Sequence, residues 1–204
     1  ELAVTISGGA DMKGLNFDNA GYTLRTMPQI GPDWDAKADR YEYRHFFSYI
    51  NGKKKDTALK SNQTKLITDS VPWAGISGKY FSLIVIPSVP AQQILYSSAQ
   101  PGADTVQDGQ LFFSRPVITG NKVTDVYRIY LGPCSENILS VYNIPSKNNY
   151  NYDNLRIDTV AVSSGIWRPL EVLLKWLLQF FYKLIPNWGF SIILVTILIK
   201  LIFF

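Results

Sequence analysis

Residues 187–200, NWGFSIILVTILIK, divide the chain into two parts that suit different solvents. The stretch is mostly apolar after its first residues, and it then reaches Lys200 before the chain continues as LIFF. An ammonium group inside a bilayer costs about 3 kcal/mol even on the more lenient insertion scales. Lys200 therefore needs either a functional explanation or a route by which its charge reaches water.

The residues on the two sides of this change differ in composition. Up to about residue 164 the chain is rich in polar and turn-forming residues, and after it the chain is densely apolar. A chain of 204 residues can form one domain with a core and an appendage. As a helix, residues 188–204 would be about 25 Å long, slightly less than a hydrocarbon core of about 30 Å. We therefore expect residues 187–204 to be the start of a transmembrane helix.

Residues 165–186 have the pattern of an amphipathic helix. Its apolar positions are Ile166, Leu170, Leu173, Leu174, Leu177, Leu178, Phe181 and Ile185. Its polar positions are Arg168, Glu171, Lys175, Gln179 and Lys183. Pro169 fits the first turn and Pro186 ends the helix.

Two explanations fit this amphipathic helix. One is an ordinary helix that packs on a core. The other is a helix in the membrane interface, which is favoured by the wide apolar face, the excess of basic side chains and the amphipathic rings of Trp167, Trp176 and Tyr182. Trp188, at the start of the next helix, would lie at the bilayer surface as an aromatic-belt residue.

The position of Lys200 also leaves two explanations open. It lies some dozen residues beyond Trp188, or about 18 Å along a helix, which is past the midplane of a bilayer. One is that the charge serves a function within the membrane, which is the default interpretation of an ionisable residue there. Alternatively, the ammonium group would snorkel onward to the far surface if the helix ended soon afterwards.

The first 160 residues have the pattern of an antiparallel β-sandwich. Short runs rich in aromatic and β-branched residues alternate with Gly, Pro, Asn and Asp. The expected strands lie within residues 21–27, 41–50, 65–76, 79–88, 92–99, 110–118 and 123–132. The most apolar run, residues 80–87, predicts a central strand covered on both faces. Gly120 and Asn121 predict a hairpin turn. We expect no long helix before Ser164, and a polar loop at residues 146–154.

Composition argues against several classes of function. The net charge of +4 is small and the lysines of NGKKKD, residues 51–56, are expected in a loop, so nucleic acid is not an expected partner. A single cysteine, Cys134, excludes an internal disulfide and a cysteine metal site. A single histidine, His45, leaves zinc sites and histidine-dependent triads without enough ligands, and it is expected in a strand. We expect no catalytic residues, metal or cofactor.

The two ends of the sequence have the features of cuts through a longer protein. Residues 1–9, ELAVTISGG, lack the basic start and apolar run of a signal peptide, and the chain stops within an apolar run. We expect further segments outside this sequence.

Residues 165–200, GIWRPLEVLLKWLLQFFYKLIPNWGFSIILVTILIK, resemble the YidC family of membrane protein insertases. In that family an interfacial helix leads through an NWG-SII junction into the first helix of the membrane core. The upstream stretches VPWAGISGKYFSLIVIP, residues 71–87, and VYRIYLGP, residues 126–133, are more loosely similar to strands of the family's large periplasmic domain.

The resemblance implies a fold and a location. Residues 1–164 would be a periplasmic β-supersandwich, N-terminally truncated, residues 165–186 an interfacial helix, and residues 187–204 the start of a transmembrane helix of the insertase core. The protein would be a multi-pass protein of the bacterial inner membrane. It would act as an insertase and chaperone for nascent membrane proteins, alone or with the Sec translocon, in contact with the lipid bilayer.

The resemblance also implies roles for particular residues. Lys200 falls where the family has a basic residue, usually arginine, in a hydrophilic groove open to the cytoplasm and the lipid. Lysine keeps the charge but lacks the planar, multi-donor guanidinium. Thr196, one turn earlier, would help hydrate this substrate groove. Trp167, Trp176, Tyr182 and Trp188 would lie at the membrane interface.

Two other functions fit the residues. The sandwich would be a membrane-tethered carbohydrate-binding or epimerase-like module, with Trp34 and Trp73 available to stack on sugars. Its acidic residues, Asp33, Asp35, Asp39 and Glu42, form a poor catalytic set because they are dispersed and only one histidine is present. Alternatively, the chain would be a purely structural, membrane-anchored subunit, in which leucine could replace Lys200 without harm.

Overall fold

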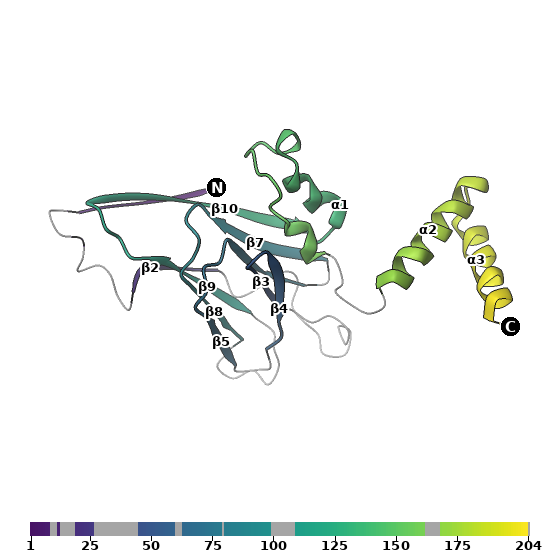
Figure 1. Cartoon of the computed structure of the whole chain (residues 1–204), viewed down its shortest axis with the longest axis horizontal. Helices are drawn as coiled ribbons and strands as arrows, with labels where there is room; N and C mark the ends of the chain where they lie inside the picture. The colour runs from purple at the N-terminus through teal and green to yellow at the C-terminus, as the bar shows by residue number, and fades with distance from the viewer. Residues whose placement is uncertain are drawn as a thin grey trace. The chain divides into compact units, whose positions relative to one another are not determined.

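The structure is a computed structural model that describes residues 1–8, 12, 19–26, 45–59, 63–78, 80–98, 109–161 and 168–203. The chain forms two compact units, Glu1–Ala161 and Val162–Phe204 (Figure 1). The first is built from strands and the second from two helices.

Unit 1 contains two antiparallel sheets. The six-stranded sheet has the order β1 (Leu2–Ser7), β10 (Lys122–Pro133), β7 (Phe81–Pro87), β6 (Trp73–Ser77), β3 (His45–Ile50) and β4 (Lys53–Thr57). The four-stranded sheet has the order β2 (Ala20–Arg25), β9 (Gln110–Pro116), β8 (Gln93–Ser97) and β5 (Thr64–Ile67). This mainly β, antiparallel architecture confirms the predicted fold class.

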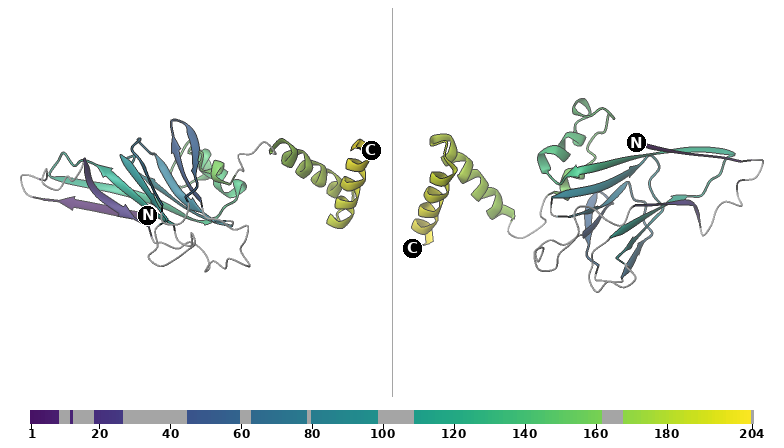
Figure 2. Two further views of the ribbon diagram at one scale, coloured as in Figure 1. Left: turned by 90° about the horizontal axis from the view of Figure 1, so that it is seen from below. Right: turned by 180° about the vertical axis from the view of Figure 1, so that it is seen from behind.

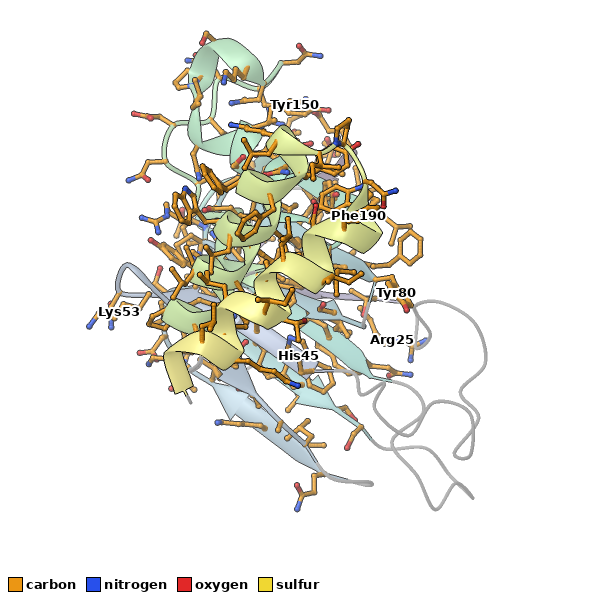
Figure 3. All side chains as sticks on the ribbon, turned by 90° about the vertical axis from the view of Figure 1, so that its right-hand side faces the viewer. Arg25, His45, Lys53, Tyr80, Tyr150 and Phe190 are labelled. Atoms are coloured by element: carbon orange, nitrogen blue, oxygen red, sulfur yellow. The ribbon has the colours of Figure 1, made fainter. Side chains whose placement is uncertain are left out.

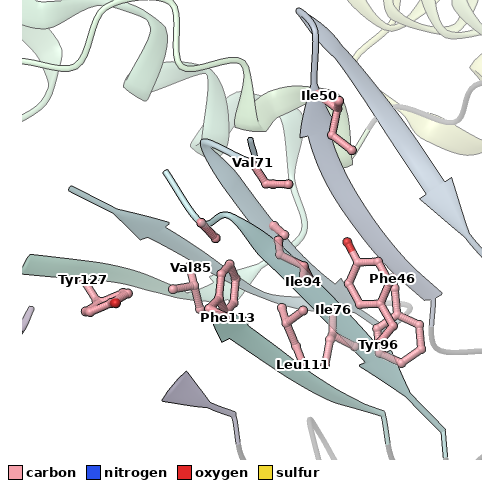
Figure 4. Close-up of a cluster of buried hydrophobic side chains, with 12 residues drawn as sticks. Phe46, Ile50, Val71, Ile76, Val85, Ile94, Tyr96, Leu111, Phe113 and Tyr127 are labelled. Carbon is pink, nitrogen blue, oxygen red and sulfur yellow. The ribbon is translucent and has the colours of Figure 1, made fainter. Parts of the chain in front are cut away.

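Apolar side chains of the two sheets meet in one core (Figure 4). Phe46 and Val85 of the larger sheet are buried with Ile94, Tyr96 and Phe113 of the smaller one. The rings of Phe46 and Tyr96 lie 4.8 Å apart. The alternation of side chains along each strand places these residues between the sheets.

The other face of the larger sheet is covered by short helical turns. These are α1 (Glu136–Leu139), η2 (Ser140–Asn143), η3 (Pro145–Lys147) and η4 (Ile157–Val160). Leu139 and Ile157 pack with Ile84 and Trp73 of the sheet in a second buried cluster. The indole Nε1 of Trp73 donates a hydrogen bond to the carbonyl oxygen of Leu155 at 2.8 Å. Strand β7 therefore lies between two cores, which confirms its predicted central position.

Two local predictions are wrong. Gly120 and Asn121 do not make a hairpin, because β9 and β10 belong to different sheets and the connection crosses between them. Lys53 is not in a loop but begins the edge strand β4 (Figure 3). The hairpin turn lies instead at Asn51 and Gly52, whose φ angles of 51° and 74° match the left-handed turns that twist with antiparallel strands.

The expected strand at residues 65–76 divides into β5 and β6, which lie in different sheets. Strand β1 was not predicted at all, although it pairs with β10 from Leu2 to Ser7. The expected loop at residues 146–154 includes part of η3, and residues 41–44 lie outside the described chain. The helices described before residue 162 are short, as expected.

Unit 2 is a pair of helices, α2 (Arg168–Leu184) and α3 (Trp188–Phe203), which lie side by side (Figures 1 and 2). Pro169 is in the first turn of α2, and Pro186 follows its last turn, as predicted. Among the described residues, no helix combines the length and the apolar character needed to cross a membrane.

Candidate functional site

The apolar face of α2 is wider than its contact with α3. Leu174, Leu177 and Leu178 are half-buried, whereas Leu173 and Leu184 are exposed. Unit 2 alone thus leaves part of this face in contact with solvent. An exposed apolar stripe of this kind is typical of a surface that meets lipid or another protein.

The aromatic residues expected at a membrane interface fall into two groups. Trp176 is 58 % exposed and stacks on Phe180 with ring centroids 5.7 Å apart. Tyr182 and Trp188 stack on each other at the junction of the helices, with centroids 4.1 Å apart and planes inclined by 17°. Trp167 lies outside the described residues.

Lys200 and Thr196 lie one turn apart on α3, and both side chains are exposed. Among residues 188–201 of α3, whose side chains the structure describes, Ser191 and Val195 are buried. At about 100° per residue, Thr196 and Lys200 fall on the opposite side of the helix from this buried pair. The structure therefore brings the two expected groove residues together on the α3 face that points away from α2.

The chemistry of this face is simple. The Thr196 hydroxyl donates to the carbonyl oxygen of Ile192 at 2.8 Å, so its lone pairs remain open to water or to a donor. The neighbouring side chains of Ile193 and Ile197 are 55 % and 50 % exposed. Within residues 168–203 the ion pair described is on α2, where Lys175 meets Glu171 at 2.6 Å. Apart from the Thr196 hydroxyl, Lys200 is surrounded on this face by apolar side chains.

The residues considered for a sugar site do not gather in the described structure. Trp73 is fully buried and hydrogen-bonded, so it cannot stack on a sugar ring. His45 begins strand β3, as expected, and its burial lowers the pKa of the imidazole. Trp34 and the acidic residues between positions 33 and 42 lie outside the described residues. Within the described ranges, no group of His, Cys, Asp and Glu side chains could hold a metal ion.

Residues at the α2–α3 junction were missed at the level of sequence. The side-chain oxygen of Asn187 accepts the backbone N–H of Gly189 at 2.9 Å, and the Ser191 hydroxyl donates to the carbonyl oxygen of Asn187 at 2.9 Å. The signal was present, because asparagine directly before an apolar run is a favoured helix N-cap.

Comparison with known proteins gives the following relatives. The chain is 48 % identical over 204 residues to "Membrane protein insertase YidC" of Treponema denticola, which covers 100 % of this chain and 35 % of that protein. It is 49 % identical over 195 residues to the protein of the same name from Treponema pallidum, covering 96 % of this chain and 31 % of the relative. The protein of that name from Syntrophus aciditrophicus is 28 % identical over 206 residues, covering 93 % of this chain and 34 % of the relative. No model of a protein family matches the chain. The chain spans about a third of the length of these relatives.

Proposed function

Because the chain belongs, along its full length, to the YidC family of membrane protein insertases, we propose that it supplies the charged helix face of an insertase and the surface helix that leads to it. The observation that carries this proposal is the exposed Lys200 beside Thr196 on the side of α3 that faces away from α2. A cation at this place in an apolar helix would be costly in lipid unless the face were wet.

The proposed mechanism needs no covalent step. A lysine ammonium in a hydrated groove attracts acidic side chains of an incoming hydrophilic segment, and this attraction is stronger than in bulk water because the surroundings have a lower dielectric constant. Water in the groove lowers the cost of moving the polar segment partway across the bilayer. The apolar helix of the substrate then leaves sideways into lipid, because burial of its side chains there is favourable.

Helix α2 is proposed to lie in the interface on the periplasmic side of the inner membrane. Its exposed apolar stripe would enter the boundary between headgroups and acyl chains, with Trp176 and, beyond the described residues, Trp167 in the interface. Tyr182 and Trp188 would lie at the same level, at the point where α3 turns into the membrane. The remaining part of the proposal is that residues 187–204 begin a transmembrane helix.

The location and partners follow from the same proposal. The whole protein would be a multi-pass protein of the bacterial inner membrane, with residues 1–164 in the periplasm, residues 165–186 in the interface and residues 187–204 entering the membrane. Its partners would be nascent membrane proteins, the lipid bilayer and, for some substrates, components of the Sec translocon. The relatives that support it are named as insertases, and no chemical catalysis is proposed.

The test is a depletion experiment in vivo with the whole protein. The unaltered protein, Lys200→Arg, Lys200→Leu and Lys200→Glu would each be asked to rescue insertion of a small single-span substrate with an acidic translocated segment. We expect Arg to rescue and Leu and Glu to fail, because the groove needs a positive charge. Protein levels in the membrane are measured in parallel, so that a loss of insertion is not a loss of the protein.

A matched control is Lys183→Leu, which removes an exposed cation from the polar side of α2. It should rescue as well as the unaltered protein. Equal rescue by all Lys200 variants would show that the ammonium group only reaches water, as a structural anchor would, and it would overturn the proposed role of Lys200.

A further inference from the structure

The junction between α2 and α3 is short and held by several contacts. Asn187 is the N-cap of α3, because its side-chain oxygen accepts the N–H groups of Gly189 at 2.9 Å and Phe190 at 3.4 Å. These N–H groups have no partner within the helix. The backbone N–H of Asn187 also donates to the carbonyl oxygen of Ile185 at 2.6 Å, which ties the cap to the end of α2.

Ser191 holds the same residue from the other side. Its hydroxyl donates to the carbonyl oxygen of Asn187 at 2.9 Å, and its backbone N–H donates to that oxygen at 3.1 Å. The Ser191 side chain is fully buried. A larger side chain at position 191 would not fit this buried site without displacing the first turn of α3.

The stacked rings of Tyr182 and Trp188 add a contact between the helices. Tyr182 lies in the last turn of α2 and Trp188 is the first residue of α3. Their centroids lie 4.1 Å apart and their planes are inclined by 17°. Trp188 is nevertheless 54 % exposed, so the ring is not there to fill a core. A stacked pair opposes rotation of α3 about its own axis, which a backbone cap alone does not.

The junction affects the position of Lys200 because a small change in the direction of α3 is amplified along the helix. Lys200 is a dozen residues beyond Trp188, or about 18 Å along the helix. A change of about 20° in the direction of α3 would therefore move Lys200 by about 6 Å. Coulomb energy is inversely proportional to distance, so a charge partner first at about 4 Å and then at about 10 Å would keep less than half of its attraction.

We propose that Tyr182, Asn187, Trp188 and Ser191, together called the elbow, are positioning residues that set the depth and facing of Lys200 relative to the surface helix α2. This inference deepens the proposed insertase function and rests on it. The elbow itself contacts no substrate. It acts by fixing the helix that carries the cation.

The test measures geometry and insertion in the same variants. Nitroxide labels are placed in the whole protein in lipid nanodiscs at Gln179→Cys and Ile197→Cys, which are exposed on α2 and α3, in a background from which Cys134 and any other cysteine have been removed. Insertion is measured with the same elbow variants without labels, because Ile197 lies near Lys200 on α3. Pulsed electron spin resonance gives the distribution of label distances. Asn187→Ala and Trp188→Leu should broaden the distribution, since loss of a cap alone raises the share of displaced helices about five-fold.

Conservative variants separate positioning from a general loss of structure. Asn187→Asp keeps the accepting oxygen and Trp188→Phe keeps a stacking ring, so both should restore the narrow distribution and insertion. Phe190→Leu is the matched control, because it removes an exposed ring from the same turn of α3. It should change neither readout.

An unchanged distance distribution in both Asn187→Ala and Trp188→Leu would overturn the inference, whatever happens to insertion. So would broad distributions with full insertion activity in a protein whose Lys200→Leu variant is inactive. If Lys200→Leu inserts normally while the elbow variants still broaden the distances, the proposed function fails and the elbow is only a structural corner. Circular dichroism establishes that α2 and α3 remain helical in each variant.

Discussion

Asp125 links the two sheets of unit 1 through buried polar contacts. Its carboxylate is 3 % exposed and accepts Arg115 Nε at 2.8 Å and the Tyr22 hydroxyl at 2.7 Å. Tyr22 in turn accepts the Tyr127 hydroxyl at 2.9 Å. These residues come from β2, β9 and β10, so the network joins the smaller sheet to the larger one. Burial, together with this network, raises the pKa of the Tyr22 hydroxyl.

Asp125→Ala should lower the free energy of unfolding by about 3 kcal/mol, because it leaves the Arg115 guanidinium buried without its counter-charge. The measurement is chemical denaturation of the chain monitored by far-UV circular dichroism. The matched control is Glu1→Gln, which removes an exposed ion pair with Arg128 and should cost less than about 0.5 kcal/mol. Equal effects of the two changes would contradict the role given to Asp125.

The burial of His45 leads us to expect that the free energy of unfolding falls on acidification. Burial lowers its pKa below the ordinary value of 6.5, Asp56 opposes this change and Lys54 adds to it. As the pH falls below about 6.5, the unfolded chain binds a proton that the folded chain does not, so the free energy of unfolding declines until the folded-state pKa is passed. His45→Gln should flatten this part of the stability curve measured between pH 5 and about 8. A curve identical to that of the unaltered chain would exclude the effect.

At the residue scale, the sequence identifies an unusual charge more readily than it identifies which side chains contact each other. Lys200 stands out because a cation interrupts an apolar run. Asp125 was not identified, because its partner Arg115 comes from a strand of the other sheet. The same applies to Tyr182 and Trp188, whose stacking requires the turn between their helices.

At the scale of elements, β6 depends on a glycine. A Cβ on Gly75 would collide with the carbonyl oxygen of Leu83 on β7 and would lie 2.6 Å from the ring of Phe47. Gly75→Ala should therefore cost about 3 kcal/mol in unfolding free energy, by forcing apart a strand that is buried on both faces. Gly120→Ala is the control, because the nearest atom to its Cβ would be 3.7 Å away. The prediction fails if both variants unfold at the same denaturant concentration.

The predictions of helices and strands succeeded for segments with a clear hydrophobic pattern. They failed for β4 and for the hairpin, whose positions depend on the type of turn. The apolar run of residues 80–87 identified β7, and helical spacing identified α2 with its prolines at both ends. Strand β4 was missed because its three successive lysines look like a loop. Lys53 and Lys55 are exposed, and lysine on an edge strand prevents unwanted pairing. Asn51-Gly52 carried the stronger hairpin signal than Gly120-Asn121, since the order Asn-Gly suits the turn that fits twisted strands.

At the scale of the whole molecule, the exposed apolar stripes of unit 2 determine behaviour in water. Trp176, Leu184 and Leu201 are among the apolar side chains that α2 and α3 leave exposed. Without lipid or detergent, we expect the chain to self-associate through these helices, because so much apolar surface has no other cover. Sedimentation velocity with and without detergent measures this, and a chain ending at residue 161 is the control that should remain monomeric. A full chain that stays monomeric without detergent would contradict the prediction.

The assignment of strands to sheets could not be predicted from the sequence. Strand β1 pairs with β10 and β2 pairs with β9, which joins residues far apart in the chain. Local patterns give strand positions but no information on such pairings, and alternation is compatible with several sheet orders. The composition of the chain changes near residue 164, and the two units of the structure meet close to that position, at Ala161 and Val162.

The pairing of β1 with β10 also sets an order of events during synthesis. Leu2 pairs with Tyr127, so the first strand waits for its neighbour while more than a hundred residues are added, for about 10 s at typical rates of elongation. Strand β2 likewise waits for β9. The sheets can close only after β10 has left the ribosome or translocation pore, and the apolar helices follow still later. Strands β1 and β2 therefore remain without these sheet neighbours while the residues up to β9 and β10 are added, and their apolar side chains need other cover during that time.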